Sequence, residues 1–330
     1  MLRKSVSTGQ IRHGFKRRIP SQKWTIRDEL AEPESDSDDE DYNEDSSDNE
    51  ESEDNEESDD KKTIKRRLNR HVYESHDALL TLKDRYDITE QLHKDNFYCF
   101  LANDKVYGQC VIKICRRKNQ PTKTPKEVRC HVRAEKIPNV LKMLKWHELD
   151  YDHYCIVTPF MSDDCISNVF NSNVKIQSYM KQLLTILNQC LEVDLMHRDI
   201  KPSNLFWDDN TGILTLTDFD CSTFYCNRVR YYRIGTCGFR SPEMYNGNGY
   251  TWKNDVYSCG IVFGMLLYNV DSEYDVIGKP KKWRKYGKKY GKNRSEYYKC
   301  SRDLLRMMLS VDPEKRPSYE ECLQHRFFQI

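Results

Sequence analysis

Two short polar stretches hold the residues of this chain that are best suited to chemistry. One is His197–Asn204 (His-Arg-Asp-Ile-Lys-Pro-Ser-Asn) and the other is Asp218–Asp220 (Asp-Phe-Asp). Phosphoryl transfer needs metal ions held against phosphates, a carboxylate beside the attacking hydroxyl, and countercharge set in place beforehand. Two acids, a lysine and an asparagine at fixed offsets can supply all of these. The pattern therefore predicts a phosphoryl-transfer site.

The spacing of these residues resembles that of the eukaryotic protein kinases, and the resemblance implies a role for each. Asp199 would accept or orient the proton of the substrate hydroxyl, and Lys201 would neutralise charge on the transferred group. Asn204 and Asp218 would bind Mg²⁺, with ATP as the phosphate donor. Asp220 departs from the family, which usually has glycine there. It would cost backbone freedom and bring a second negative charge near the metals.

The first hairpin of the expected N-terminal sheet also departs from the family pattern. Strands are predicted at 88–92, 97–102 and 109–114 from their β-branched and aromatic residues. In kinases the first hairpin carries a Gly-rich loop, but residues 93–98 contain no glycine. Lys94 and the Asn96 amide would substitute in part, and ATP binding is expected to be weak or unusual. The ATP-binding residues implied for this hairpin are Leu92, His93, Lys94, Asp95, Asn96, Phe97, Tyr98 and Phe100.

Lys113, in Val111-Ile112-Lys113, matches the strand lysine that holds the α- and β-phosphates in kinases. Its expected partner is Glu127, on a helix predicted over 126–137, with Glu135 near the helix end as the competitor. The strand 154–157 would lead into the hinge between lobes. By resemblance, Thr158 guards the back of the nucleotide pocket and Met161 belongs to the segment facing adenine. A proline at 159 removes one amide donor from that segment.

The remaining kinase landmarks follow in order along the chain. A helix over 176–193 is predicted as scaffold that leads into the catalytic loop 197–204, and a hairpin over 205–216 is predicted to deliver Asp218 to the cleft. Thr236 would position the peptide by bonding Asp199 and Lys201, as in Ser/Thr kinases. The resemblance further implies an ion pair of Glu243 with Arg316, and a contact from Asp255 to the backbone of the catalytic loop.

These landmarks imply an α+β, two-lobed protein kinase fold over 79–330. The N-lobe, about 79–158, would be a small antiparallel sheet plus one helix, and the C-lobe, about 162–330, would be mainly helical. Residues 197–204 and 235–243 look most like the cell-division-cycle kinases that fire replication origins. The chain is also similar to the kinases of large DNA viruses that infect eukaryotes, which can be compact and lack glycines of the Gly-rich loop.

The 330-residue chain has a net charge of +1 that hides a strong asymmetry. Residues 32–60 hold 18 of the 52 acids and no Lys or Arg. Composition predicts that 1–78 is a disordered extension, basic over 1–31, acidic over 32–60 and basic over 61–71. The acidic part could equally be an inert tail or a target of acid-directed kinases. Residues 16–18 form one basic cluster, and the basic run 61–67 is a nuclear import signal, a nucleic-acid patch or ordinary linker, with nuclear placement slightly favoured over cytoplasmic.

Cysteine usage and hydropathy indicate an intracellular chain with no membrane partner. The 13 cysteines are scattered and no signal peptide opens the chain, so reduced thiols are expected. No apolar run approaches the length of a membrane span.

Residues 278–299 contain ten Lys and Arg, with Trp and Tyr among them, against one acid. Four uses compete: steering acidic protein substrates, binding nucleic acid, docking the acidic segment 32–60, or a solvated loop with none of these roles. The overall prediction is a Ser/Thr protein kinase acting on protein substrates, with an activating subunit as a candidate partner. The alternatives are a pseudokinase scaffold with little or no turnover and a nucleic-acid-associated protein.

Overall fold

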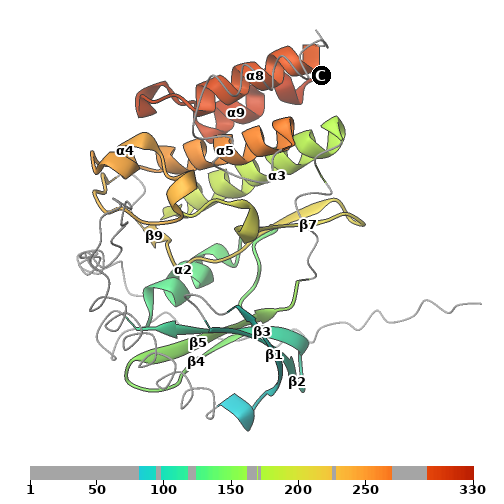
Figure 1. Cartoon of the computed structure of the whole chain (residues 1–330), viewed down its shortest axis with the longest axis vertical. Coiled ribbons are helices and arrows are strands. Elements are labelled where there is room, and N and C mark those ends of the chain that lie inside the picture. The colour runs from blue at the N-terminus through green and yellow to red at the C-terminus, as the bar shows by residue number, and fades with distance from the viewer. Residues whose placement is uncertain are drawn as a thin grey trace, which may run out of the picture. The chain divides into compact units, whose positions relative to one another are not determined.

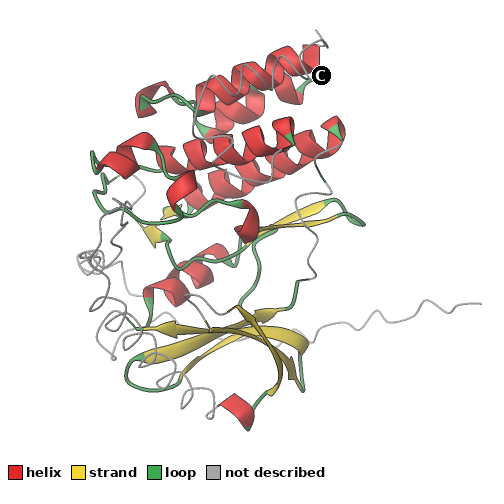
Figure 2. Cartoon of the chain, viewed as in Figure 1, coloured by secondary structure: helices red, strands yellow, loops and turns green. Residues whose placement is uncertain are grey.

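The computed structural model describes residues 82–93, 98–117, 124–161, 169, 172–224, 228–269 and 296–330. Within these residues an antiparallel sheet and one helix come first, and a larger, mainly helical part follows (Figures 1 and 2). The sheet has the strand order β1-β2-β3-β5-β4. Its strands are β1 Asp87–His93, β2 Tyr98–Asp104, β3 Gly108–Arg116, β4 Lys145–Glu148 and β5 His153–Pro159.

The two faces of this sheet bury different side chains because successive residues of a strand point to opposite faces. One face carries a hydrophobic cluster that includes Phe100, Ile112 and Val157. On the other face, Tyr154 and Ile156 pack with Val128 of helix α2, Lys126–Ala134. Lys113 is directly opposite Ile156 in the β3–β5 ladder, so the lysine belongs to the face that α2 covers.

The helical part buries one large core around the two long helices α3 and α5. Ser172 caps α3 by accepting a hydrogen bond from Lys175 N, and nearly every residue of α5 is buried. Helices α3 and α5 lie side by side, with α8 and α9 beyond them (Figure 1). The helices are α3 Asn173–Glu192, α4 Pro242–Asn246, α5 Lys253–Tyr268, α8 Glu296–Met308 and α9 Tyr319–Gln324.

Two small two-stranded sheets and four 3-10 turns complete the described part. Strands β6 Leu195–Met196 and β9 Thr223–Phe224 pair with each other, as do β7 Leu205–Asp208 and β8 Ile213–Leu216. The 3-10 turns are η3 Pro202–Asn204, η4 Cys237–Phe239, η5 Pro313–Lys315 and η6 Arg326–Phe328.

A backbone link joins the segment after α2 to strand β8. Leu141 N donates to Leu216 O at 2.9 Å, and Leu216 N donates to Asn139 O at 2.9 Å. Asp218 follows two residues after this anchor. The link therefore fixes the start of the Asp-Phe-Asp stretch relative to α2 and the sheet.

The predicted elements are present, with shifted ends. The helix expected over 126–137 ends at Ala134, where Ile137 N closes a tighter turn onto Ala134 O at 2.9 Å and Pro138 follows. Strand β4 was not predicted. The proposed extension 1–78 lies outside the described residues, so the domain boundaries stay predictions. Among the described helices, none combines the length and apolarity needed to cross a membrane.

Candidate active site

Asp199 is buried at the centre of a hydrogen-bond cluster. Its Oδ1 accepts from the amide and the hydroxyl of Thr236, both at 2.8 Å. Its Oδ2 accepts from Lys201 Nζ at 2.8 Å and from Asn204 Nδ2 at 3.1 Å. Lys201 also donates to Thr236 Oγ1 at 2.7 Å. The structure thus brings together four residues that the sequence analysis selected, and it fixes the carboxylate in one orientation.

Asp255, from the first turn of α5, holds the backbone of the loop that carries Asp199. Its two carboxylate oxygens accept from the amides of His197 and Arg198, each at 2.9 Å. These bonds support Arg198 in a left-handed conformation with φ 68°. Burial raises the pKa of Asp255, against the opposing effect of His197 and the two amide bonds. The predicted contact below the catalytic loop is present.

Lys113 lies among three carboxylates. Its Nζ is 3.0 Å from Glu127 Oε1, 2.7 Å from Asp218 Oδ1 and 3.8 Å from Asp220 Oδ2. Glu127 also accepts from Tyr154 Oη at 3.0 Å. Of the two glutamates considered from sequence, Glu127 is the one that faces the lysine.

The pKa values of this cluster reflect burial acting against charge. Burial alone would lower the pKa of Lys113, but Glu127, Asp218 and Asp220 raise it well above its ordinary value. Burial raises the pKa of Glu127 despite the nearby lysine. Burial alone would also raise the pKa of Asp218, but Lys113, and then His197 and Lys201, hold this pKa below its ordinary value. Asp218 is therefore a carboxylate at neutral pH, while Lys113 is charged.

Comparison with known proteins matches residues 99–328 to the protein kinase domain. The chain belongs to this family. The matched residues cover the sheet from β2 onward, the whole Asp199 cluster and the Lys113 cluster. The predicted two-lobed kinase fold, with an N-terminal antiparallel sheet and a helical part, is confirmed.

Curated relatives are also kinases, at low identity. Calcium-dependent protein kinase 3 of Plasmodium berghei is 28% identical over 268 residues, which are 75% of this chain and 47% of that protein. A probable myosin light chain kinase of Dictyostelium discoideum is 27% identical over 271 residues, 76% of this chain and 55% of that protein. The chain spans about half the length of the relatives it matches. These matches support protein kinase activity at the level of the domain.

The donor atoms fit the divalent cation that a kinase uses. Asn204 Nδ2 donates to the backbone O and to Oδ2 of Asp199, which leaves the side-chain carbonyl oxygen of Asn204 for a cation. Asp218, whose Oδ1 accepts from Lys113, adds a carboxylate. Carboxylate and amide oxygens are the ligands that Mg²⁺ prefers, with waters completing its shell. Asn204 and Asp218 would therefore hold it.

The segment after β5 narrows the choice of adenine contacts in this kinase domain. Pro159 has no amide hydrogen, and Phe160 N donates to Gln109 O of β3 at 3.3 Å. Met161 N is then the remaining backbone donor of 159–161. Thr158 is opposite Val111, two residues from Lys113, so it belongs to the lysine's face of the sheet, as expected for a residue at the back of the pocket.

The strand register corrects two of the predicted ATP-binding residues. Tyr98 is opposite Ile114 and Phe100 is opposite Ile112, so both belong to the hydrophobic face away from Lys113. Cys99, directly opposite Lys113, and Leu101, opposite Val111, are β2 residues on the lysine's face, and both were missed. Period-two alternation places Tyr98 and Phe100 on one face of β2, but only the register with β3 shows that this face points away from Lys113.

The other predicted hairpin residues are only partly placed. Leu92 is half-buried near the end of β1, and the His93 backbone pairs with Cys99. Lys94, Asp95, Asn96 and Phe97 lie outside the described residues, as do 278–295 of the basic segment. Residues 296–299 of that segment form the first turn of α8.

The predicted ion pair of Glu243 with Arg316 is bidentate and buried. Arg316 Nη1 and Nη2 donate to the two carboxylate oxygens of Glu243, each at 2.6 Å. The same guanidinium donates to Ser310 O at 2.8 Å. This pair ties α4 to the segment before α9.

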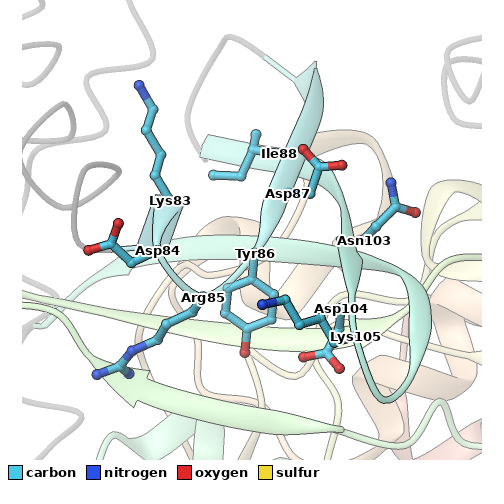
Figure 3. A pocket seen from close by; sticks show the side chains of 9 residues that line it. All are labelled: Lys83, Asp84, Arg85, Tyr86, Asp87, Ile88, Asn103, Asp104 and Lys105. Carbon is cyan, nitrogen blue, oxygen red and sulfur yellow. The ribbon is translucent and has the colours of Figure 1, made fainter.

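A separate cavity of about 630 Å³ lies at the outer end of the sheet (Figure 3). It is formed by the residues before and at the start of β1 and by the β2–β3 turn, and it contains no predicted site residue. Figure 3 shows that cations and acids surround it in equal number, so it does not favour a polyanion such as ATP; they are Lys83, Arg85 and Lys105 with Asp84, Asp87 and Asp104.

Proposed function

We propose that this chain is a Ser/Thr protein kinase that transfers the γ-phosphate of ATP to protein hydroxyls with Mg²⁺. The observation that carries the proposal is the bonding of Asp199, Lys201 and Thr236 into one unit beside the Lys113 cluster. A kinase site needs a base, a countercharge and a metal ligand converging on one place. These side chains supply all three.

The contacts of each side chain indicate its role in the transfer. Asp199 would take its place beside the substrate hydroxyl, with Thr236 holding Oδ1 and Lys201 holding Oδ2. Because Lys201 is already charged and fixed, it needs no reorganisation when negative charge develops nearby. Lys113 is held by Glu127 and would contact the phosphates of ATP. Mg²⁺ on Asn204 and Asp218 would neutralise phosphate charge.

A labelled-ATP assay separates this proposal from the pseudokinase alternative. The wild-type chain should transfer label to serine and threonine of a mixed protein substrate, as phosphoamino-acid analysis would show. Asp199→Asn should lower kcat by roughly a hundredfold or more while ATP still binds. Asp218→Asn should lower both transfer and Mg²⁺-dependent ATP binding. Binding of ATP without transfer by the wild type would favour the pseudokinase, and label on tyrosine would refute the Ser/Thr assignment.

We further propose that acidic proteins are among its substrates, because of a basic face on α8. Lys299, Arg302 and Arg306 recur at helical spacing along one side of this helix, where they line a cavity of about 430 Å³ with Arg326. Glu296, paired with Arg326, and Asp303, paired with His325, offset only part of this charge. The face continues in sequence from the basic segment 278–295.

Charge reversal on this face tests the preference. The double variant Arg302→Glu and Arg306→Glu should raise KM for an acidic peptide several-fold at low salt and leave KM for a neutral peptide unchanged. Lys315→Glu, at a site 77% exposed on η5, is the matched control. Equal KM values for both peptides would refute the preference. If the double variant instead loses nucleic-acid binding with a steep salt dependence, the face serves nucleic acid.

A further inference from the structure

Kinase activation segments are commonly ordered by a phosphate that pairs with arginines. The activation segment of this chain runs from Asp218 to Arg240, and Ser222 and Thr223 are two hydroxyl residues near its start. In the structure both are fully buried. Ser222 Oγ donates to His197 O at 3.3 Å, and Thr223 pairs with Met196 across the β6–β9 ladder. Neither hydroxyl is presented to another kinase in this arrangement.

Arg198 donates hydrogen bonds to two neutral groups of the chain itself. Its Nε donates to Cys221 O at 2.6 Å, and its Nη1 donates to the hydroxyl of Tyr250 at 3.0 Å. Tyr250 is 2% exposed. Its backbone exchanges two hydrogen bonds with Arg230, at 2.8 and 2.7 Å, and Arg230 Nη2 donates to Phe224 O at 2.9 Å. Tyr250 therefore connects the catalytic loop with two points of the activation segment.

Helix α2 contacts the same segment through Phe224. The ring of this buried residue has the guanidinium of Arg129 at 5.9 Å and that of Arg133 at 5.6 Å. These arginines are four residues apart, on one face of α2, and Glu127 precedes them on the same helix. A guanidinium over an aromatic ring is attracted by the charge distribution of the ring, and more strongly where water is excluded.

We propose that Phe224 and Tyr250 are positioning residues that hold α2 and the catalytic loop ready for catalysis without a phosphate on the activation segment. The inference rests on the proposed kinase function. Phe224 fixes α2, and with it the pairing of Glu127 with Lys113. Tyr250 fixes Arg198, which adjoins Asp199. The ring of Phe224 and the hydroxyl of Tyr250 thus contact arginines, as a phosphate does in kinases with a phosphorylated activation segment.

The first test removes phosphate and measures activity. The full chain is treated with a broad-specificity phosphatase, and mass spectrometry verifies that 218–240 carries no phosphate. The treated protein should keep at least half of its kcat/KM. A tenfold or larger loss, restored by phosphate within 218–240, would overturn the inference. A chain that transfers no phosphate before or after treatment would refute the proposed function instead.

The second test removes the two contacts in the phosphate-free protein. Phe224→Leu should lower kcat/KM roughly tenfold and weaken ATP binding several-fold, whereas Phe224→Tyr, which keeps the ring, should stay near wild type. In an Arg133→Leu background the effect of Phe224→Leu should shrink, because its partner is gone. ATP affinity is read by calorimetry, so the coupling to Lys113 is tested even without turnover.

Tyr250→Phe should lower kcat by roughly fivefold to tenfold and leave KM for ATP unchanged, because it removes only the hydroxyl bonded to Arg198. Tyr245→Phe, at a tyrosine 51% exposed, is the matched control and should have no effect. The inference is wrong if Phe224→Leu and Tyr250→Phe both behave as the wild type, or if Phe224→Leu and Phe224→Tyr lose activity equally.

Discussion

Glu127→Gln is the most informative single change in this site, because it removes a charge and keeps the shape. Glu127 is 6% exposed and contacts Lys113, Tyr154 and the thiol of Cys115. After the change, Lys113 still has Asp218 at 2.7 Å and Asp220 at 3.8 Å. The lysine therefore keeps charged partners in its buried position. It can move toward Asp218 and away from the position where phosphates would meet it.

The size of the effect follows from these distances. Two unit charges 3.0 Å apart attract by roughly 5 kcal/mol at an effective dielectric constant of about 20. Desolvation of the buried pair offsets much of this, so a net coupling of about 1.5–3 kcal/mol is expected. Since 1.36 kcal/mol is a factor of ten in rate, kcat/KM should fall by roughly 10- to 150-fold. The free energy of unfolding should fall by only about 1 kcal/mol, because the lysine keeps other partners.

Initial rates at several ATP concentrations, together with urea unfolding, measure both quantities. Glu135→Gln is the matched control, because this glutamate lies just past the end of α2 and was the competing candidate. It should leave rate and stability unchanged. If Glu127→Gln retains more than half of the wild-type kcat/KM, Lys113 does not depend on Glu127, and the assignment is refuted. Equal losses in both variants would point to helix stability in place of the ion pair.

Three further predictions concern the surroundings of the site. Gly235→Ala should lower kcat strongly, because the added Cβ would lie 2.3 Å from Arg198 O. Gly247→Ala is the control: it has a similar positive φ and open space around it, so it should lower the free energy of unfolding in urea by only about 1–2 kcal/mol. Arg316→Met should lower the free energy of unfolding by about 3–5 kcal/mol, seen as a drop of roughly 6–20 °C in Tm, and Lys315→Met should change neither. Burial, then Arg85 and Lys145, lowers the pKa of His147 from its ordinary 6.5, so its neutral form stabilises the fold above about pH 6.5 and this stability is lost as the pH falls below that value. Urea midpoints at pH 7.5 and 5.5 should therefore differ less in His147→Gln than in the wild type, and equal differences would contradict the assignment.

Much of the site was predictable from sequence because its residues act over short, fixed offsets. Asp199, Lys201 and Asn204 share one loop, so their spacing nearly determines that they can meet. The longer connections to Thr236, Asp255 and Arg316 came from the family pattern and not from local physics. The choice of Glu127 over Glu135 depended on where the helix ends, which α2 resolves at Ala134.

The errors came from features that only three dimensions define. Phe100 was assigned to the ATP site because it lies near the hairpin, but the β2–β3 register puts it opposite Ile112 on the other face. The burial of Ser222, which is fully buried and donates to His197 O, is likewise defined only by the fold. The contact of Tyr250 with Arg198 joins residues 52 positions apart, and no local pattern signals it.

Asp220 shows how structure changes the meaning of a sequence departure. A glycine is favoured where the backbone adopts a positive φ, and the residue of this stretch that does so is Asp218, with φ 65°. Asp220 is not among the positive-φ residues of the described chain, so its side chain imposes no left-handed strain in this conformation. The consequence of the substitution is electrostatic: Asp220 adds a third carboxylate near Lys113 and contributes to the raised pKa of that lysine. In this arrangement the departure therefore acts through the charge near Lys113 and not through strain of the backbone.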